Sequence, residues 1–396
     1  MHILIAALHR PSNPTGVCRY AANLAQCLAD TPEVSKVTLI IGVWQRQYFE
    51  QLFHSDKIKL ISVDIKNNSL VRNIWFLFGL PILVNSLSPD IVHMSFPFPF
   101  LRPLFSSPVV STIHDLYPYE KPEVFGYPNV IFNRLFLKQC IQNSNSLTCV
   151  SQTTLSSLHS YFPHLQSCSE ISVIYNYVDF NHITPQPPVD LNIGKNDSFL
   201  LCVAQHRKNK NIDLLIQAFY LLKKYEPIPH STKLIIVGNT GPETERLYNQ
   251  IQYLLLQDQV LLIRAIKDEE LCWLYQKCQV FIAPSSQEGF CLPLAEALYF
   301  SCRVVCSNIP IFREIAGSSC CYFDIQGDAV KNISQAILDA LEQPHNQTSD
   351  NFHFSKSDVA RQYLKFYSKI ICINPTFRTS ICSIYTSIIS SIRIKY

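Results

Sequence analysis

The sequence contains little glycine and lacks the glycine-rich loop of dinucleotide-binding proteins. Only 10 of its 396 residues are glycine, and no segment reads GxGxxG. In dehydrogenases this motif lets the backbone approach a pyrophosphate closely at the start of a helix. Its absence argues against a hydride-transferring dehydrogenase that binds NAD.

Strong charge and disulfide patterns are missing as well. The formal net charge of +3 at pH 7 is too small to indicate a nucleic-acid-binding surface, so no nucleic-acid partner is expected. The 15 cysteines show no CxxC spacing, and the adjacent Cys320 and Cys321 suit neither a metal site nor an ordinary disulfide. We therefore expect reduced, mostly buried thiols.

Long hydrophobic runs are also absent. The most apolar run, residues 75–84, is about half as long as a membrane-spanning helix, and it predicts a packed helix instead. Residues 1–8 lack the basic lead-in and the cleavage site of a signal peptide, and they predict a first strand. These features favour a cytoplasmic protein.

The length predicts two domains of roughly 150–200 residues each. In both halves short apolar runs alternate with amphipathic helical patterns, which is typical of a doubly wound α/β fold with a parallel sheet. The expected strands are residues 2–8, 37–42, 58–63, 90–94, 109–113, 146–150, 199–203, 233–237, 260–263, 280–283 and 303–306.

The boundary between the domains is expected within residues 174–188, where prolines and asparagines occur without periodicity. We predict a Rossmann-like N-terminal domain over residues 1–180 and a Rossmann-like C-terminal domain over residues 189–350. A helix over residues 351–370 is expected to return toward the N-terminal domain.

Residues 371–396 form a tail rich in serine and isoleucine. Its pattern is that of a poorly ordered or domain-packed extension. The alternative is a weak membrane-surface contact through the isoleucines together with Arg393 and Lys395.

Residues 280–300 combine a buried strand, a loop opened by Pro284 and a helix expected to start near Pro293. Glu288 lies in the loop and Glu296 in the helix. An anion can bind the N-terminus of such a helix, while the carboxylates accept hydrogen bonds from hydroxyl groups. An anion together with several hydroxyls suggests a sugar nucleotide as the ligand.

In doubly wound sheets, ligands bind beyond the carboxyl ends of the strands. We therefore expect the site at four loops that carry polar residues or glycine. They are residues 14–16, His114, residues 205–211 and residues 285–292.

Several segments resemble those of one enzyme family and occur in the same order. They are TIHDL at 112–116, RKNKNIDLLIQAF at 207–219, LIIVG at 234–238, DEELCWLYQKCQVFIAPSSQEGFCLPLAEAL at 268–298 and FREIAG at 312–317. They are similar to the GT-B-fold retaining glycosyltransferases of family 4, also called glycosyl transferases group 1. The resemblance covers residues 1–370 and is strongest over 199–320. It implies two Rossmann-like domains facing a cleft, the first binding the acceptor and the second a nucleotide sugar.

The resemblance implies that Glu288 contacts hydroxyls of the donor sugar and that Glu296 contacts the ribose. Gly289, Phe290, Cys291 and Leu292 complete the loop whose backbone N–H groups face the donor phosphates. Outside this context, a pair of glutamates is explained equally well without a ligand, with Glu288 as a solvated loop residue and Glu296 as a first-turn helix residue favoured by the dipole.

A basic pair, Arg207 and Lys210, is implied to hold the diphosphate, with Lys208 as a competing candidate because RKNK leaves the register open. Fixed cations there stabilise the charge that develops on the leaving group. The alternative for each residue is a solvated basic turn.

In the first domain, His114 matches the family histidine over the donor sugar, with Asp115 orienting its loop. Gly16 matches one of two paired glycines near the phosphates or the acceptor, and Thr15 replaces the other. Without this context His114 is more typical of a structural role, and Gly16 of a turn.

The chain departs from the family where glycines are replaced, at Ala204, Ala265, Cys291 and Ser301. A side chain at Cys291 crowds the backbone N–H groups expected to face phosphate. A catalytically degenerate nucleotide-sugar-binding protein is therefore an alternative, and a GT-B sugar-nucleotide epimerase is another.

The expected reaction is transfer of a hexosyl unit, with mannosyl suggested by HDLYP at 114–118, from a nucleoside-diphosphate sugar with retention of configuration. No covalent carboxylate nucleophile is assigned. No DxD-type metal motif stands in a loop, and the resemblance implies that no metal is needed. No cofactor is expected, because the nucleotide sugar is the donor substrate. The family's usual setting is bacterial surface polysaccharide or lipopolysaccharide assembly. It implies a glycan or lipid-linked acceptor and a peripheral contact with the inner membrane face.

Overall fold

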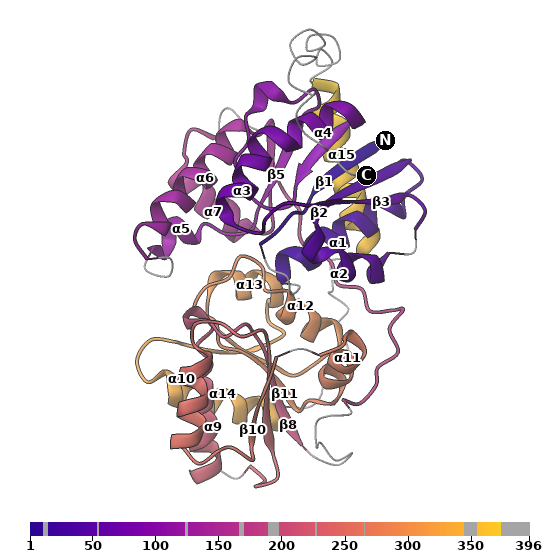
Figure 1. Ribbon diagram of the computed structural model, residues 1–396. Helices are drawn as coiled ribbons and strands as arrows, with labels where there is room; N and C mark the ends of the chain where they lie inside the picture. Colours follow the sequence, from indigo (N-terminus) through magenta and orange to yellow (C-terminus); the bar gives the residue numbers. More distant parts are fainter. Residues whose placement is uncertain are drawn as a thin grey trace. The chain divides into compact units, whose positions relative to one another are not determined.

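The computed structural model describes residues 1–10, 15–53, 55–122, 126–165, 170–188, 198–225, 228–264, 266–343 and 355–373. It divides into two compact units (Figure 1). Unit 1 comprises Met1–Tyr177 and the chain from Lys356 onward, and unit 2 comprises Val178–Ser355. Pro14, Ala265 and the predicted tail from residue 374 lie outside the described residues.

Unit 1 is built on a seven-stranded parallel sheet with the strand order β3-β2-β1-β4-β5-β6-β7. Its strands are β1 His2–Ala6, β2 Lys36–Gly42, β3 Ile58–Val63, β4 Ile91–Met94, β5 Val109–Ile113, β6 Ser146–Cys149 and β7 Glu170–Val173. Its helices are α1 Gly16–Ala29, α2 Arg46–Leu52, α3 Ser69–Ile74, α4 Leu80–Leu87, α5 Tyr117–Glu120, α6 Asn129–Asn143, α7 Gln152–Tyr161 and α15 Lys356–Ile373. The yellow α15 packs on α1 (Figure 1).

Unit 2 repeats this design with a six-stranded parallel sheet of order β10-β9-β8-β11-β12-β13. Its strands are β8 Phe199–Val203, β9 Lys233–Val237, β10 Val260–Ile263, β11 Val280–Ala283, β12 Val304–Ser307 and β13 Cys321–Phe323. Its helices are α9 Ile212–Tyr225, α10 Thr244–Tyr253, α11 Asp268–Lys277, α12 Leu292–Tyr299, α13 Pro310–Ala316 and α14 Ala329–Glu342, and the 3₁₀ turn η5 covers Lys208–Lys210.

The strands of unit 2 are apolar on both faces because helices cover both. Leu200 and Cys202 of β8 pack with α9 and α14 on one face. Phe199 and Leu201, the alternate residues, pack on the other face with α11, α12 and α13. Alternate side chains of a strand point to opposite faces, so this arrangement explains the near-continuous apolar runs in the sequence.

The predicted α/β class and the two parallel sheets are confirmed, with corrections at element ends and at the sheet edges. The first strand ends at Ala6, not at residue 8, and α12 begins at Leu292, not at Pro293. The strands β7 and β13 were not predicted. Both lie at sheet edges with a single neighbour, and most of their residues are only partly buried. The strand β7 contains polar residues, and β13 is only three residues long.

The apolar run at 75–84 belongs to a longer helical stretch, Ser69–Leu87, in which α3 and α4 are joined by a π turn at Trp75–Gly79. Within the part of the chain that the structure describes, it is the one stretch long and apolar enough to cross a membrane by composition. Its buried side chains, including Phe76, Leu80 and Val84, pack in the core of unit 1. The prediction of a packed helix is confirmed for the side of the helix that carries these buried side chains.

Each sheet has a switch point, where neighbouring strands lead to connections in opposite directions. It lies between β1 and β4 in unit 1 and between β8 and β11 in unit 2. Such points leave a crevice at the carboxyl ends of the strands. In unit 2, the two flanking loops are those that carry Lys210 and Glu288.

Glycine is required where the loop after β9 passes the loop after β8. A Cβ atom at Gly238 would lie 1.9 Å from the carbonyl oxygen of Ala204, and one at Gly241 would lie 2.2 Å from that of His206. Both distances are far inside van der Waals contact. These two glycines therefore let the loop after β9 lie directly against the backbone of the loop after β8, which leads to Arg207.

We predict that Gly238→Ala lowers the free energy of unfolding by about 2 kcal/mol or more, because the carbonyl group must move to admit the methyl group. Gly16→Ala is the matched control, since no described heavy atom lies within 4 Å of a Cβ built there. It is expected to change stability by less than about 0.5 kcal/mol. Chemical denaturation of both variants measures the difference, and equal stabilities would contradict the packing argument.

Candidate active site

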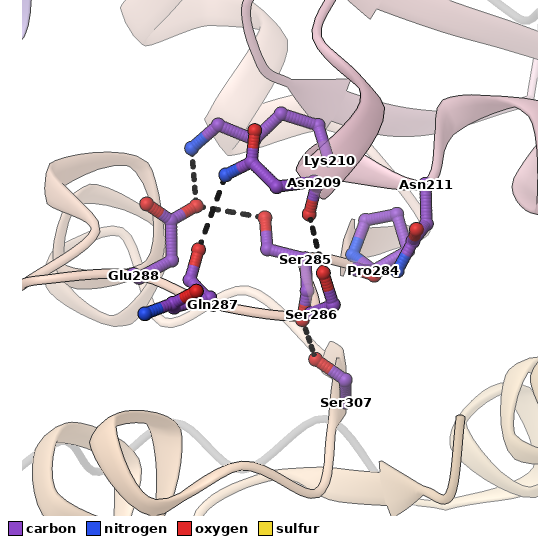
Figure 2. A network of polar contacts seen from close by, with 9 residues as sticks. All are labelled: Asn209, Lys210, Asn211, Pro284, Ser285, Ser286, Gln287, Glu288 and Ser307. Carbon is purple, nitrogen blue, oxygen red and sulfur yellow. Dashed lines mark hydrogen bonds and ion pairs between the residues drawn. The ribbon is translucent and has the colours of Figure 1, made fainter. Parts of the chain in front are cut away.

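The loops after β8 and β11 in unit 2 are joined by hydrogen bonds from two asparagines (Figure 2). The side chain of Asn211 donates to the carbonyl oxygen of Pro284 at 2.8 Å, and that of Asn209 donates to the carbonyl oxygen of Gln287 at 3.3 Å. The Ser286 amide donates to the carbonyl oxygen of Asn209 at 2.8 Å. Asn211 has φ of 49°, in the left-handed region that asparagine tolerates well. The two loops thus form one structural unit.

Glu288 lies at the centre of this unit and accepts from two side chains. Lys210 donates to its Oε1 atom as an ion pair, and the Ser285 hydroxyl donates to the same oxygen at 2.7 Å (Figure 2). Burial lowers the pKa of Lys210, but Glu288 outweighs it, so the pKa lies above its usual value. Lys210 is therefore a fixed cation at pH 7, held by a carboxylate that is itself largely buried.

The structure separates the three basic residues of the RKNK segment. Lys210 is partly buried against Glu288, whereas Arg207 and Lys208 are exposed. Arg207 has extended backbone and precedes η5. Lys208, the competing candidate, does not take the position of Lys210 beside Glu288.

The loop ends at the N-terminus of α12, where Cys291 takes the N-cap position. No side chain caps this terminus, and the first-turn amide of Leu294 donates to the carbonyl oxygen of Cys291 at 3.1 Å. Cys291 has φ of 69°, a left-handed conformation that favours glycine. Burial and then Glu288 raise the pKa of its thiol, so it is uncharged at pH 7. Phe290 before it is buried, Gly289 is partly exposed, and Leu292 opens the helix.

Glu296 lies in α12 and is 3% exposed. Its Oε2 atom accepts a hydrogen bond from the hydroxyl of Tyr275 in α11 at 2.8 Å. A carboxylate offers about four acceptor positions, so this bond orients the group without exhausting it. The sequence did not indicate Tyr275 as a site residue, because in α11 it follows the apolar pattern of a core tyrosine.

His114 follows β5 in unit 1, and its Nε2 atom donates to the carbonyl oxygen of Ser95 at 2.8 Å. Burial lowers its pKa to about 4, so the ring is neutral at pH 7 and Nδ1 is a hydrogen-bond acceptor. Asp115 accepts from the amide of Tyr117 at 3.1 Å and shapes the start of α5. The Tyr20 ring lies edge-on to His114 at 4.7 Å between centroids.

Tyr20 is the hub of a buried polar network that holds α15 in place. Its hydroxyl lies 2.7 Å from that of Tyr363 and 2.6 Å from that of Thr112. His93 joins it, with Nε2 at 2.9 Å from Thr112 and Nδ1 at 2.7 Å from the hydroxyl of Tyr367. The bonded pair Tyr20 and Tyr363 is separated by 343 positions in the sequence, so no local pattern could have indicated the network.

Gly16 is the first residue of α1, directly after the switch-point strand β1 and its loop. Thr15, in place of the family's partner glycine, is the N-cap residue but makes no capping hydrogen bond. No described atom lies within 4 Å of the position that a Cβ at Gly16 would take. Packing among the described residues therefore gives no reason for glycine at this position.

Comparison with protein-family models matches both halves of the chain. Residues 14–182 match the model described as Glycosyltransferase Family 4, and residues 186–353 match Glycosyl transferases group 1. The chain belongs to the GT-B glycosyltransferases of group 1. Both matches together cover every candidate site residue named above, while β1 and α15 of unit 1 lie outside them.

This glycosyltransferase is similar to the O-antigen chain mannosyltransferase RfbU of Salmonella typhimurium, with 25% identity over 84% of this chain and 90% of the relative. Its fold matches the solved sucrose-phosphate synthase of Thermosynechococcus elongatus with a TM-score of 0.73, at 17% identity over 94% of this chain and 99% of the other. It also matches HepE of Anabaena, solved in complex with UDP and glucose, with a TM-score of 0.65, at 17% identity over 93% and 100% of the chains. The two structures establish the GT-B fold.

Acidification is predicted to destabilise unit 1 through His93, which is fully buried. Burial lowers its folded pKa from 6.5 to about 3, so between these values the unfolded chain binds the proton and the folded protein does not. The free energy of unfolding then falls as pH falls, by about 1.4 kcal/mol per pH unit for this group. In His93→Gln, denaturation between pH 6 and pH 4 should show a slope shallower by about that amount. An unchanged slope would contradict the assignment.

The left-handed conformation of Cys291 leads to a second prediction. At an ordinary helical position, a protein with alanine has a higher free energy of unfolding than one with glycine. At Cys291 the order should be reversed, with Cys291→Gly more stable than Cys291→Ala by about 1 kcal/mol, because a Cβ atom is strained in the left-handed conformation. Both variants lose the thiol, so their difference isolates the backbone strain. Urea denaturation measures it, and an alanine variant at least as stable as the glycine variant would contradict it.

Proposed function

We propose that this glycosyltransferase transfers a hexosyl unit, with mannosyl as the first choice, from a nucleoside-diphosphate sugar to a glycan or lipid-linked acceptor with retention of configuration. The observation that carries the proposal is the Lys210–Glu288 ion pair beside the N-terminus of α12 at the switch point of unit 2. A fixed cation and the positive end of a helix dipole favour a diphosphate, and carboxylates favour hydroxyls.

Lys210 and Arg207 have the role of stabilising the leaving diphosphate. As the glycosidic bond breaks, negative charge grows on the bridging oxygen, so a cation held in advance favours the transition state over the ground state. Lys210 is held by Glu288. Arg207 is exposed at the start of the same segment. No metal ion or cofactor has a role in this scheme.

Glu288 and Glu296 have the role of binding the two hydroxyl-bearing parts of the donor. Glu288 accepts from the donor sugar and Glu296 from the ribose, while Gly289, Phe290, Cys291 and Leu292 offer backbone groups to the phosphates. We assign His114 to the sugar as well, through its neutral ring. Retention follows in this scheme if the departing phosphate oxygen takes the proton of the attacking acceptor hydroxyl on the same face of the sugar, so that the new bond forms where the old one breaks.

The similarity to an O-antigen chain mannosyltransferase supports mannosyl transfer in bacterial surface polysaccharide assembly. The UDP complex of a protein with the same fold supports a nucleotide-sugar donor. With a lipid-linked acceptor, the enzyme would work at the inner face of the membrane. The left-handed backbone conformation of Cys291, where the family has glycine, supports one alternative, a protein that binds a nucleotide sugar without turnover.

Incubation of the purified protein with UDP-, GDP- and ADP-sugars and a glycan acceptor is expected to release nucleoside diphosphate with at least one donor. NMR of the product gives the anomeric configuration, and retention is expected. Donor binding by calorimetry without release would support the degenerate alternative, and a free epimer without acceptor would support an epimerase. Neither binding nor release with any donor would overturn the proposal.

Lys210→Gln and Glu288→Gln are predicted to lower kcat by about 10²–10³-fold, because each removes a group aimed at the donor. Lys208→Gln is the matched control from the same turn, and its rate should stay within about threefold. The double variant Lys210→Gln with Glu288→Gln removes both charges and controls for folding, since each single variant leaves an unpaired partner. Equal rates for the Lys208 and Lys210 variants would show that the cation is misassigned.

A further inference from the structure

A hydrogen bond at the candidate site of unit 2 joins the helices α11 and α12, both labelled in Figure 1. The Tyr275 hydroxyl of α11 donates to the Oε2 atom of Glu296 in α12 at 2.8 Å. Both side chains are buried, since Tyr275 is 1% exposed and Glu296 3%. The orientation of this carboxylate therefore depends on where the tyrosine ring lies.

The ring and the backbone of Tyr275 are held as well as its hydroxyl. The ring stacks on that of Phe300 with centroids 5.6 Å apart, and it lies 5.7 Å from the ring of Phe281 in β11. Its backbone carbonyl oxygen accepts from the thiol of Cys302 at 3.1 Å and from that of Cys278 at 3.4 Å. A side chain held in this way has little freedom to change rotamer, so it can keep the carboxylate in one orientation.

Phe300 extends these contacts to residues 178–188, by which the chain enters unit 2 and which we call the entry segment. The Phe300 amide donates to the carbonyl oxygen of Glu296 at 3.1 Å, one helical turn earlier. The Phe300 ring lies 5.2 Å from the ring of Phe180, which is 8% exposed. The Tyr299 hydroxyl donates to the side chain of Asn181 at 2.9 Å. The entry segment is thus attached to the C-terminal end of α12.

The entry segment is attached to α11 as well. The amide of Gln186 donates to the carbonyl oxygen of Glu269 at 3.0 Å. Glu269 lies in the first turn of α11, the helix that carries Tyr275. The entry segment therefore contacts both helices whose side chains form the bond to the carboxylate.

We propose that Tyr275 and Phe180 are positioning residues for nucleotide binding. Phe180 acts through the ring of Phe300 on Tyr275, and Tyr275 orients the carboxylate of Glu296. The proposal rests on the proposed function, in which this carboxylate accepts hydrogen bonds from the ribose. Hydrogen bonds weaken steeply when their angles depart from the ideal, so a small rotation of the carboxylate weakens its bonds to the ribose hydroxyls. The entry segment thereby contributes to nucleotide affinity without contact with the nucleotide.

A positioning role and a purely structural role predict different ligand dependence. If Tyr275 only fills the core, its loss affects stability and lowers the affinity for every nucleotide alike. If it orients the ribose carboxylate, its loss lowers affinity only for ligands that carry ribose hydroxyls. A nucleotide that lacks these hydroxyls therefore separates the two roles.

The test is calorimetry of the full chain with UDP, GDP and ADP and with their 2′,3′-dideoxy analogues. The unchanged protein is expected to bind at least one nucleotide, about tenfold or more tightly than its analogue. Tyr275→Phe should weaken binding of that nucleotide by about tenfold and change binding of the analogue by less than about twofold. Phe180→Leu should have the same selective effect with a smaller size, about threefold, because it acts through two intervening rings.

Phe219→Leu is the matched control, because Phe219 is buried in the core on the other face of the same sheet. It should bind both ligands like the unchanged protein. A double variant with Phe180→Leu and Tyr275→Phe should bind the nucleotide no more weakly than Tyr275→Phe alone. The reason is that Phe180 acts on the carboxylate only through the hydroxyl that Tyr275→Phe removes.

Equal losses for the nucleotide and its analogue in Tyr275→Phe would overturn the proposal and assign the tyrosine to the core alone. Additive losses in the double variant would overturn the role of Phe180. Nucleotide binding that neither single variant changes would also overturn the proposal, and it would leave the proposed function standing. If the unchanged protein binds none of the three nucleotides, the proposed function fails and the proposal fails with it.

Discussion

The ion pair between Lys210 and Glu288 is the interaction on which the candidate site of unit 2 depends. It connects the loops after β8 and β11, the two strands at the switch point, and the second of these loops leads into the N-terminus of α12. Removal of either partner would leave the other charge partly buried and unpaired, which is costly. The pair therefore sets the geometry of the loops as well as supplying a cation. The asparagine hydrogen bonds and the close backbone approach at Gly238 support the same arrangement.

Unit 1 holds its candidate site with neutral hydrogen bonds instead of charges. His114 and His93 both have lowered pKa values because they are surrounded by protein, and their partners are carbonyl and hydroxyl groups. A neutral ring suits contact with sugar hydroxyls, whereas a charged ring there would need a partner carboxylate. The C-terminal helix α15 completes this network through Tyr363 and Tyr367. Helix α15 thus supports the position of Tyr20, and through Tyr20 that of His114.

The sequence predicted the fold and the loops of the site for a clear physical reason. Central strands of parallel sheets are buried on both faces and appear as apolar runs, and the loops after them carry the remaining polar residues. This logic found the region of Glu288 and of Lys210. It failed at β7 and β13, since edge strands are only partly covered. It also failed at Tyr275, because a tyrosine whose ring packs in the core and whose hydroxyl meets a carboxylate appears in the sequence as a core residue.

The sequence by itself determined the α/β class, the family and the identity of the candidate site residues, because periodicity and short motifs are local properties. Tertiary structure alone decided which of the residues from Arg207 to Lys210 meets Glu288, since the register of a short turn depends on what packs against it. It also decided that α15 joins a network with Tyr20, and that one side of Ser69–Leu87 is buried while the other is exposed. These are contacts between segments far apart in the chain, and only the folded arrangement brings them together.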